Sequence, residues 1–159
     1  MIRMKFTNMI TIDRPPAAVF TFLAQFHNVP MWNYAIDKTW KVTDGPAGVG
    51  SRYRQTRTIP RKSEEAFEVT EFEPHHRLCI RGALGPLYGD VSYLLAPAGN
   101  GTVLTNTMNL QPSGALRLVA PVVAFRVKSA VAANLDALKQ ILEAEGRPDS
   151  GGPRRGSQP

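Results

Sequence analysis

The sequence predicts an α+β domain in which seven short strands form an antiparallel sheet and one long helix follows them. Three observations support this fold class. Short runs alternate apolar and polar residues with a period of two, which is typical of half-buried strands. Turn residues separate these runs, and the last apolar stretch has the period of an amphipathic helix. A chain of 159 residues suits one domain with its own core.

The first strand is expected at residues 5–12, where Phe6 and Ile10 alternate with threonines. The prolines at 15–16 have the fixed φ that favours a helix start, and apolar residues at helical spacing follow them. A second helix of one or two turns is expected near residues 31–34. Two short helices therefore connect the first strand to the rest of the sheet.

Six further extended runs come next, and Gly, Pro, Asn and Asp occupy the stretches between them. Connections this short favour antiparallel neighbours, so we expect a meander. The runs cover residues 36–43, 51–59, 64–72, 77–82, 88–95 and 102–110.

The last ordered element is expected to be a helix over residues 115–145. Pro121 fits the first turn of a helix better than its interior. Counted from that proline, the helix has about 25 residues and a length of ~37 Å, enough to cross a whole sheet. One face carries Val123, Val127, Ala130, Val131, Asn134, Leu135, Leu138 and Ile141.

The C-terminal stretch 147–159 contains no large apolar side chain that could dock on a core. We therefore expect one domain over residues 1–146 and a disordered tail over residues 147–159.

The net charge of +6 raises the question of nucleic-acid binding. Five basic residues between Arg52 and Lys62 are followed directly by five glutamates. In a hairpin turning at residues 60–63, Arg57 would face Glu65 and Arg54 would face Glu68. This pairing neutralises the basic run, so no nucleic-acid partner is expected.

The single cysteine and the length of the apolar stretches bear on where the protein is located and whether it enters a membrane. Cys79 stands alone in an apolar run, so no intramolecular disulfide can form and the residue is interpreted as part of the core. The chain opens without the apolar region of a signal peptide. The longest strictly apolar stretch, residues 118–125, is far shorter than the ~20 residues needed to span a bilayer. We expect a cytoplasmic protein without membrane insertion.

Motifs for metal, cofactor or nucleophilic chemistry are not recognisable from spacing. His75 and His76 are adjacent, and no cysteine or acidic partner stands at ligand spacing. The glycines lie in turns and none has the context of a phosphate-binding loop. No metal and no cofactor is expected, and catalytic residues cannot be assigned.

Several local phrases are characteristic when combined with this order of elements. They are Ile12 to Phe20 (IDRPPAAVF), Pro30-Met31-Trp32, Val49 to Arg52 (VGSR), Val69 to Pro74 (VTEFEP) with Arg77-Leu78, and Asn134-Leu135. Over residues 4–144 the chain resembles the START-like (SRPBCC) superfamily, nearest to its polyketide cyclase/dehydrase branch. The resemblance implies a helix-grip fold, in which a curved sheet wraps around the long helix. It also implies an internal ligand cavity between sheet and helix, entered near the small helices.

The candidate cavity lining combines inward strand positions with the helix stripe. Trp32 either stands at the cavity mouth or plugs the small helix against the sheet. The Asn134 amide, within an apolar stripe, requires a backbone partner or a ligand. Tyr53 and Tyr93 either point into the cavity or cover core. The full set is Trp32, Trp40, Tyr53, Gln55, Phe67, Val69, Ile80, Tyr93, Met108, Val123, Val127 and Asn134.

Three functions are compatible with this resemblance. The first is binding of a small hydrophobic molecule, lipid-like or aromatic, in the cavity. The second is a polyketide cyclase, aromatase or dehydratase activity in the same cavity. The third is an interaction module like the chaperone-ATPase activators of a related branch, for which an exposed apolar patch would be diagnostic. We expect the first, in a monomer or weak homodimer.

Overall fold

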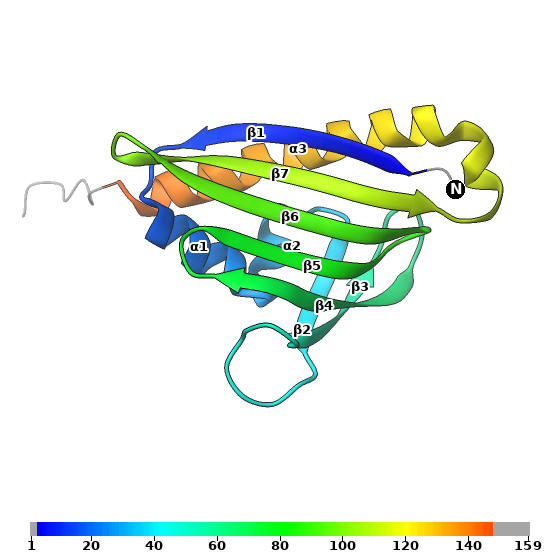
Figure 1. Ribbon diagram of the computed structural model, residues 1–159, viewed down its shortest axis with the longest axis horizontal. Helices are drawn as coiled ribbons and strands as arrows, with labels where there is room; N and C mark the ends of the chain where they lie inside the picture. Colours follow the sequence, from blue (N-terminus) through cyan, green and yellow to red (C-terminus); the bar gives the residue numbers. More distant parts are fainter. Residues whose placement is uncertain (1–2, 148–159) are drawn as a thin grey trace, which may run out of the picture.

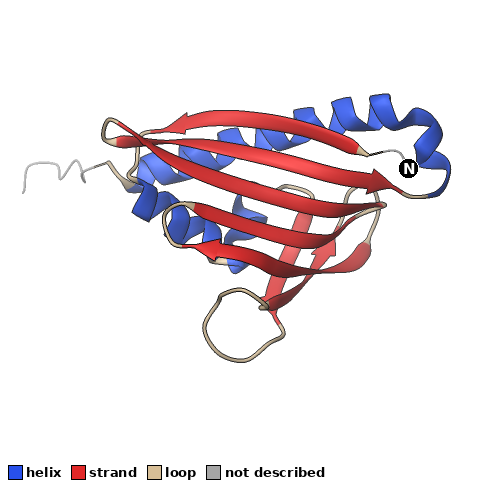
Figure 2. Ribbon diagram, in the orientation of Figure 1, coloured by secondary structure: helices blue, strands red, loops and turns tan. Residues whose placement is uncertain are grey.

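The computed structural model describes residues 3–147, and one antiparallel sheet of seven strands dominates it (Figures 1 and 2). The strand order is β1-β7-β6-β5-β4-β3-β2, so β2 to β7 form a meander and β1 joins its far edge. The predicted fold class and all seven predicted strands are confirmed. The strands are β1 (Met4–Ile12), β2 (Ile36–Lys41), β3 (Arg52–Arg57), β4 (Ser63–Glu73), β5 (Arg77–Leu84), β6 (Leu87–Ala98) and β7 (Gly101–Pro112).

Three short helices connect β1 at one edge of the sheet to β2 at the other. They are α1 (Pro16–Ala24), the 3-10 turn η1 (Phe26–Asn28) and α2 (Val29–Trp32). Pro16 lies in the first turn of α1, as its fixed φ favours. The buried side chains of these helices close one end of the core.

The long helix α3 (Ala120–Glu145) follows the 3-10 turn η2 (Gly114–Val119) and runs along the sheet beside β1 (Figure 1). Pro121 lies in its first turn, as predicted. By length and composition the segment Gly114–Glu145 would qualify to cross a membrane, although its longest strictly apolar stretch is residues 118–125. Its C-terminal half is buried against the sheet beside β1, so α3 is a core helix of the fold.

The β3–β4 hairpin differs from the predicted register by two residues. Arg57 lies opposite Ser63 rather than Glu65. The turn spans residues 58–62 and so begins two residues earlier than predicted. A shift of two keeps each side chain on its face, so Arg57 still reaches Glu65 diagonally, with Nη2 2.7 Å from Oε1. Arg54 pairs with Glu64, and its predicted pairing with Glu68 is wrong.

A register shift in β2 changes which residues face the core. The irregularity falls between Ile36 and Lys38. Beyond it Thr39 is buried, whereas Trp40 is half-buried and has the Lys38 ammonium 5.4 Å from its ring centroid. The prediction that Trp40 points inward is therefore wrong, because one extra residue reverses the alternation.

Residues 148–159, which hold all of the predicted tail except Arg147, lie outside the described residues.

Candidate functional site: an apolar groove beneath the long helix

A groove of about 490 Å³ lies between the first half of α3 and one end of the sheet. Most of its lining is apolar, and exposed residues such as Tyr34 and Ile59 form its rim. It is therefore open to solvent on one side rather than a closed internal cavity. It is lined by Asn33, Tyr34, Ala35, Arg57, Ile59, Pro60, Leu84, Pro86, Leu87, Met108, Leu110, Leu116, Val123, Arg126, Val127, Ala130, Val131 and Asn134.

The topology explains why these segments meet. In an antiparallel meander, alternate connections lie at the same end of the sheet. The turns at residues 58–62 and 85–86 and the link 33–35 into β2 are such connections. The first half of α3 faces them with Val127 and Ala130, whose small side chains leave space between helix and sheet.

Asn134 supplies a polar group in this apolar lining. Its side chain is 7% exposed, and Oδ1 is buried without a hydrogen-bond partner among the described residues. The backbone partner considered from the sequence is therefore not found there. A buried acceptor left unpaired costs about 1–3 kcal/mol, which a donor entering the groove would offset.

Arg57 in the groove lining forms a buried ion pair. The Arg57 guanidinium donates to Glu65, whose carboxylate is almost fully buried. Glu65 Oε1 also accepts from Gln55 Nε2 at 2.6 Å, and Oε2 accepts from the backbone N–H of Gly85 at 2.7 Å. Because four donors surround this carboxylate, it is committed to structure and is not a free acid or base. Gly85 has φ +62°, the left-handed conformation that suits glycine at this turn.

Arg126 differs from Arg57 in that it is exposed at the groove rim. It has no ion-pair partner within residues 3–147. The groove therefore has one neutralised arginine in its wall and one free positive charge at its mouth.

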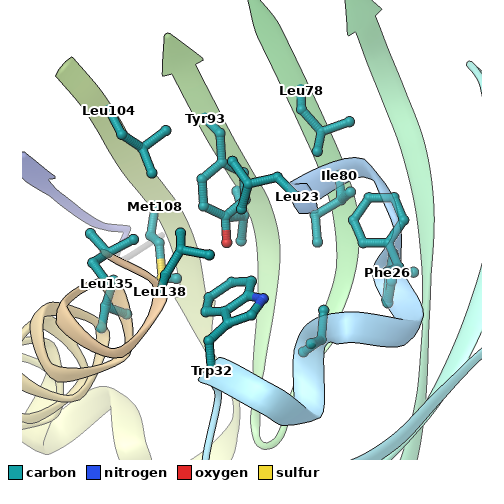
Figure 3. Close-up of a cluster of buried hydrophobic side chains, with 14 of the residues drawn as sticks. Leu23, Phe26, Trp32, Leu78, Ile80, Tyr93, Leu104, Met108, Leu135 and Leu138 are labelled. Atoms are coloured by element: carbon teal, nitrogen blue, oxygen red, sulfur yellow. The ribbon is translucent and has the colours of Figure 1, made fainter. Parts of the chain in front are cut away.

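Trp32 and Tyr93 lie in the core behind the groove. Their rings meet edge to face with centroids 6.4 Å apart, and both side chains are buried (Figure 3). Trp32 Nε1 has no hydrogen-bond partner among the described residues. Burial raises the pKa of the Tyr93 phenol, so the hydroxyl stays neutral. Trp32 thus packs α2 against the sheet and does not line the groove. The next two residues, Asn33 and Tyr34, do line it.

The structure brings four of the predicted lining residues together in the groove: Met108, Val123, Val127 and Asn134. The other candidates lie elsewhere. Tyr53 and Phe67 stack with centroids 5.2 Å apart and pack on Phe26 of η1. Gln55 belongs to the Glu65 network, and the remaining strand candidates are Val69 and Ile80 in the hydrophobic core.

Groove residues contributed by turns were not predicted from the sequence. Ile59 and Pro60 come from the β3–β4 turn, Pro86 lies in the β5–β6 turn, and Leu84 precedes that turn. Counting strand ends in the predicted meander would have placed these turns at one end of the sheet. An apolar residue within a turn there was the available signal.

The outer face of the sheet has a second hollow, of about 570 Å³, but it is polar. Four of its five charged side chains pair with one another, Arg77 with Glu71 and Arg81 with Asp90 at 2.7 Å, and the fifth is Lys5. Cys79 also faces this hollow, with Sγ 3.1 Å from Glu71 Oε2, and burial raises the pKa of its thiol. The hollow therefore has neither an apolar lining nor a reactive thiolate.

No group of three or more His, Cys, Asp or Glu side chains that could hold a metal ion occurs within residues 3–147. His75 has φ +69° at the β4–β5 turn, and its ring lies 6.2 Å from that of Phe20. These residues offer no metal centre.

The sheet, the short helices after β1 and the long C-terminal helix define an α+β protein of the helix-grip type, here with an open apolar groove. Solved structures share this fold. The Zhui aromatase/cyclase from Streptomyces sp. R1128 matches with a TM-score of 0.79 and 13% identity, covering 95% of this chain and 100% of its own. A START superfamily protein from Mycobacterium smegmatis matches with a TM-score of 0.77 and 14% identity, covering 89% and 98%.

A Polyketide_cyc-like protein from Corynebacterium glutamicum is 22% identical, with a TM-score of 0.65 and coverages of 91% and 94%. No curated protein matches the chain by sequence. The family model described as "Polyketide cyclase / dehydrase and lipid transport" matches residues 3–143. The chain belongs to this family, and the family resemblance read from the sequence is confirmed.

Proposed function

We propose that the protein binds a small hydrophobic molecule in the groove beneath α3. The observation that supports this most directly is the unpartnered Asn134 Oδ1, buried in the wall of an otherwise apolar groove. Ligand sites combine an apolar lining with a few placed polar groups, and volumes of about 300–1,000 Å³ are usual. The groove fits both criteria.

The chemistry of the lining indicates the kind of ligand. Its body is apolar, either lipid-like or aromatic, because Met108, Val123 and Val127 offer only dispersion contacts. It carries a hydroxyl or N–H that donates to Asn134, since the buried oxygen of an amide can only accept. Arg126 at the rim favours an acceptor or anionic group at the solvent end.

Binding without chemistry is the favoured function, because the two buried groups near the groove that could act as a base are committed. Glu65 is saturated by its donors, and the Tyr93 phenol is held neutral behind the groove. Neither is a ready general base.

A cyclase- or dehydratase-type activity is the second candidate. It is supported by the family and by two buried groups behind the groove, Trp32 Nε1 and the Tyr93 hydroxyl, which would donate to a carbonyl oxygen of a ligand that reaches them. Turnover of a short poly-β-ketone thioester, lost in Tyr93→Phe, would favour this activity over binding alone.

The central test fills the groove. Val127 lines it and is only half-buried, so Val127→Trp places an indole in empty space. The melting temperature should hold or rise, and binding of anilinonaphthalene sulfonate should fall at least about tenfold, the loss expected when ~1.4 kcal/mol of contacts is removed.

The matched control is Val42→Trp, which adds the same side chain at an exposed position outside the groove. It should leave probe binding unchanged. A Val127→Trp protein that binds the probe like the parent, or that is destabilised by the ~1–3 kcal/mol of an overpacked core, would contradict the proposal. Native mass spectrometry of the purified protein would identify a co-purifying ligand.

A further inference from the structure

Apolar side chains project into solvent where η2 passes into α3, next to the groove mouth. They are Leu118 at 88% exposure, Val119 at 46%, Val122 at 56% and Phe125 at 72%, and together we call them the α3-start patch. η2 buries no residue at all. In Figure 1 this segment forms the corner beyond the end of β7, at one extremity of the molecule.

The charge around the patch has one sign. Residues 113–135 contain Arg117, Arg126 and Lys128 and no aspartate or glutamate. All three basic side chains are exposed, and none forms an ion pair within the described part of the chain. The patch is therefore an apolar ridge flanked by free positive charge.

We propose that the α3-start patch docks on a bilayer containing anionic lipid. Segments that lie in a membrane interface bury apolar side chains at the boundary of headgroups and acyl chains, and their basic residues contact the headgroups. Leu118 and Phe125 are the most exposed side chains of the patch, so they are expected to enter the bilayer furthest. Arg117 and Lys128 would contact the anionic headgroups. The helix lies on the surface and does not cross it, because its second half is packed on the sheet.

The patch lies next to the groove mouth, so docking on a bilayer would bring the groove close to the lipids. Val122 and Phe125 of the patch are interleaved along the helix with Val123 and Arg126, which line the groove. A docked patch would bring the groove mouth to the acyl region, so a poorly soluble ligand could enter without crossing water. Docking goes beyond the proposed ligand binding and does not depend on it.

Other occupants fit less well. A second copy would bring two positively flanked patches together, on chains that each carry a net charge of +6. The C-terminal stretch 148–159 contains no large apolar side chain with which to cover the patch. An exposed apolar patch is also the feature expected of an interaction module, but the basic side chains of Arg117, Arg126 and Lys128 around this one, unpaired within residues 3–147, favour an anionic bilayer over a protein partner.

The test is co-sedimentation of the full chain with vesicles of phosphatidylcholine alone or of phosphatidylcholine with phosphatidylglycerol. The parent should bind the anionic vesicles, and raised salt should weaken that binding, because the headgroup contacts are exposed to solvent. Leu118→Ser with Phe125→Ser should reduce binding at least about tenfold, and Arg117→Gln with Lys128→Gln should remove most of the salt dependence.

The matched control is Met9→Ser with Leu94→Ser, which removes two exposed apolar side chains from the sheet, at 67% and 48% exposure. It should bind like the parent. Absence of binding to anionic vesicles, or unchanged binding by the Leu118→Ser/Phe125→Ser protein, overturns the proposal. So does a parent dimer, seen by sedimentation velocity, that this variant dissociates.

Probe binding without vesicles separates the two proposals. The Leu118→Ser/Phe125→Ser protein should still bind anilinonaphthalene sulfonate in the groove, because neither residue lines it. Loss of vesicle binding with retained probe binding supports docking. Vesicle binding by a parent that does not bind the probe would refute only the groove proposal.

Discussion

The two halves of α3 belong to one helix but have different surroundings. From Val131 onward the helix contributes Val131, Asn134, Leu135, Leu138 and Leu142 to the buried interior, whereas before Val131 only Ala120 is buried. The sequence pattern does not reveal this difference, since the apolar stripe begins at Val123. The stripe therefore shows which face of the helix is apolar, and the sheet determines how much of that face is covered.

Hydrogen bonds reinforce the contrast. In the second half, Arg14 Nη1 donates to the carbonyl of Leu142 at 2.7 Å, and Lys139 Nζ donates to that of Thr11 at 2.6 Å. The first half has one such bond, in which Asn8 Nδ2 donates to the carbonyl of Lys128 at 3.3 Å. The second half anchors the helix, and the first half is left to line a groove and face solvent.

The largest expected effect is on the free energy of unfolding, when a buried side chain in the second half of α3 is shortened. Leu138 is fully buried, so Leu138→Ala should lower the free energy of unfolding by about 2–5 kcal/mol through lost burial and a residual cavity. Val123→Ala in the first half should cost about 1 kcal/mol or less, because that side chain is only half-buried. Urea denaturation measures both, and equal losses would show that the halves do not differ.

A smaller effect concerns pH. Burial raises the pKa of Tyr93 above its ordinary value of 10.0. Below that value the phenol is protonated in both states, so its stabilising effect is complete. Above it only the unfolded chain ionises, and stability falls as pH rises toward the folded pKa. The loss of melting temperature between about pH 9 and about pH 11 should therefore shrink in Tyr93→Phe.

The control for this titration is Tyr88→Phe, on the same strand but 56% exposed. It should lose as much melting temperature as the parent over the same range. If Tyr93→Phe behaves like Tyr88→Phe, the Tyr93 phenol is not protected by burial.

Asn134 lies close to the point where the two halves of α3 meet, and it is both buried and part of the groove lining. Its replacement should therefore affect both stability and ligand binding. Asn134→Leu removes the unpartnered Oδ1, so stability should rise by about 1 kcal/mol. The parent should bind naphthol about five- to tenfold more tightly than naphthalene, through the donated hydroxyl, and the variant should not discriminate. Isothermal titration measures this ratio, and a preference retained in Asn134→Leu would mean that another group accepts the hydroxyl.

The smallest expected effect lies beyond the anchored end. Deleting residues 148–159 should leave the melting temperature within about a degree or two of the parent, because the sequence there offers no large apolar side chain to dock. A drop beyond the few degrees that ~1 kcal/mol causes would show that this stretch packs on the body.

The elements were predictable from the sequence because they depend on local chemistry. Alternation identified β1, turn residues separated β2 to β7, and Pro121 marked the first turn of α3. The face that each strand residue presents was less predictable. Trp40 was misplaced because of one extra residue in β2, and Arg54 because the β3–β4 turn begins at residue 58 instead of residue 60.

The site was harder to predict than the fold because tertiary packing decides it. Tyr53 and Phe67 alternate correctly and do face inward, yet Phe26 from η1 fills the space in front of them. The space in front of Tyr53 and Phe67 is filled by a small helix, whereas the space near Val127 is left open as the groove. Only the position of the small helices distinguishes these two regions. Periodicity contains no information on which helix covers which part of a sheet.

The pairing of β1 with β7 has a consequence for the order in which the chain can fold. The meander from β2 to β7 joins neighbours in sequence, so its hairpins can form as they leave the ribosome. Met4 pairs with Leu110, however, so β1 must wait until β7 has been synthesised. The second half of α3 then docks beside β1. Within this sheet the strand made first is thus among the last to be paired, and nascent chains that end before residue 101 contain β1 without its partner.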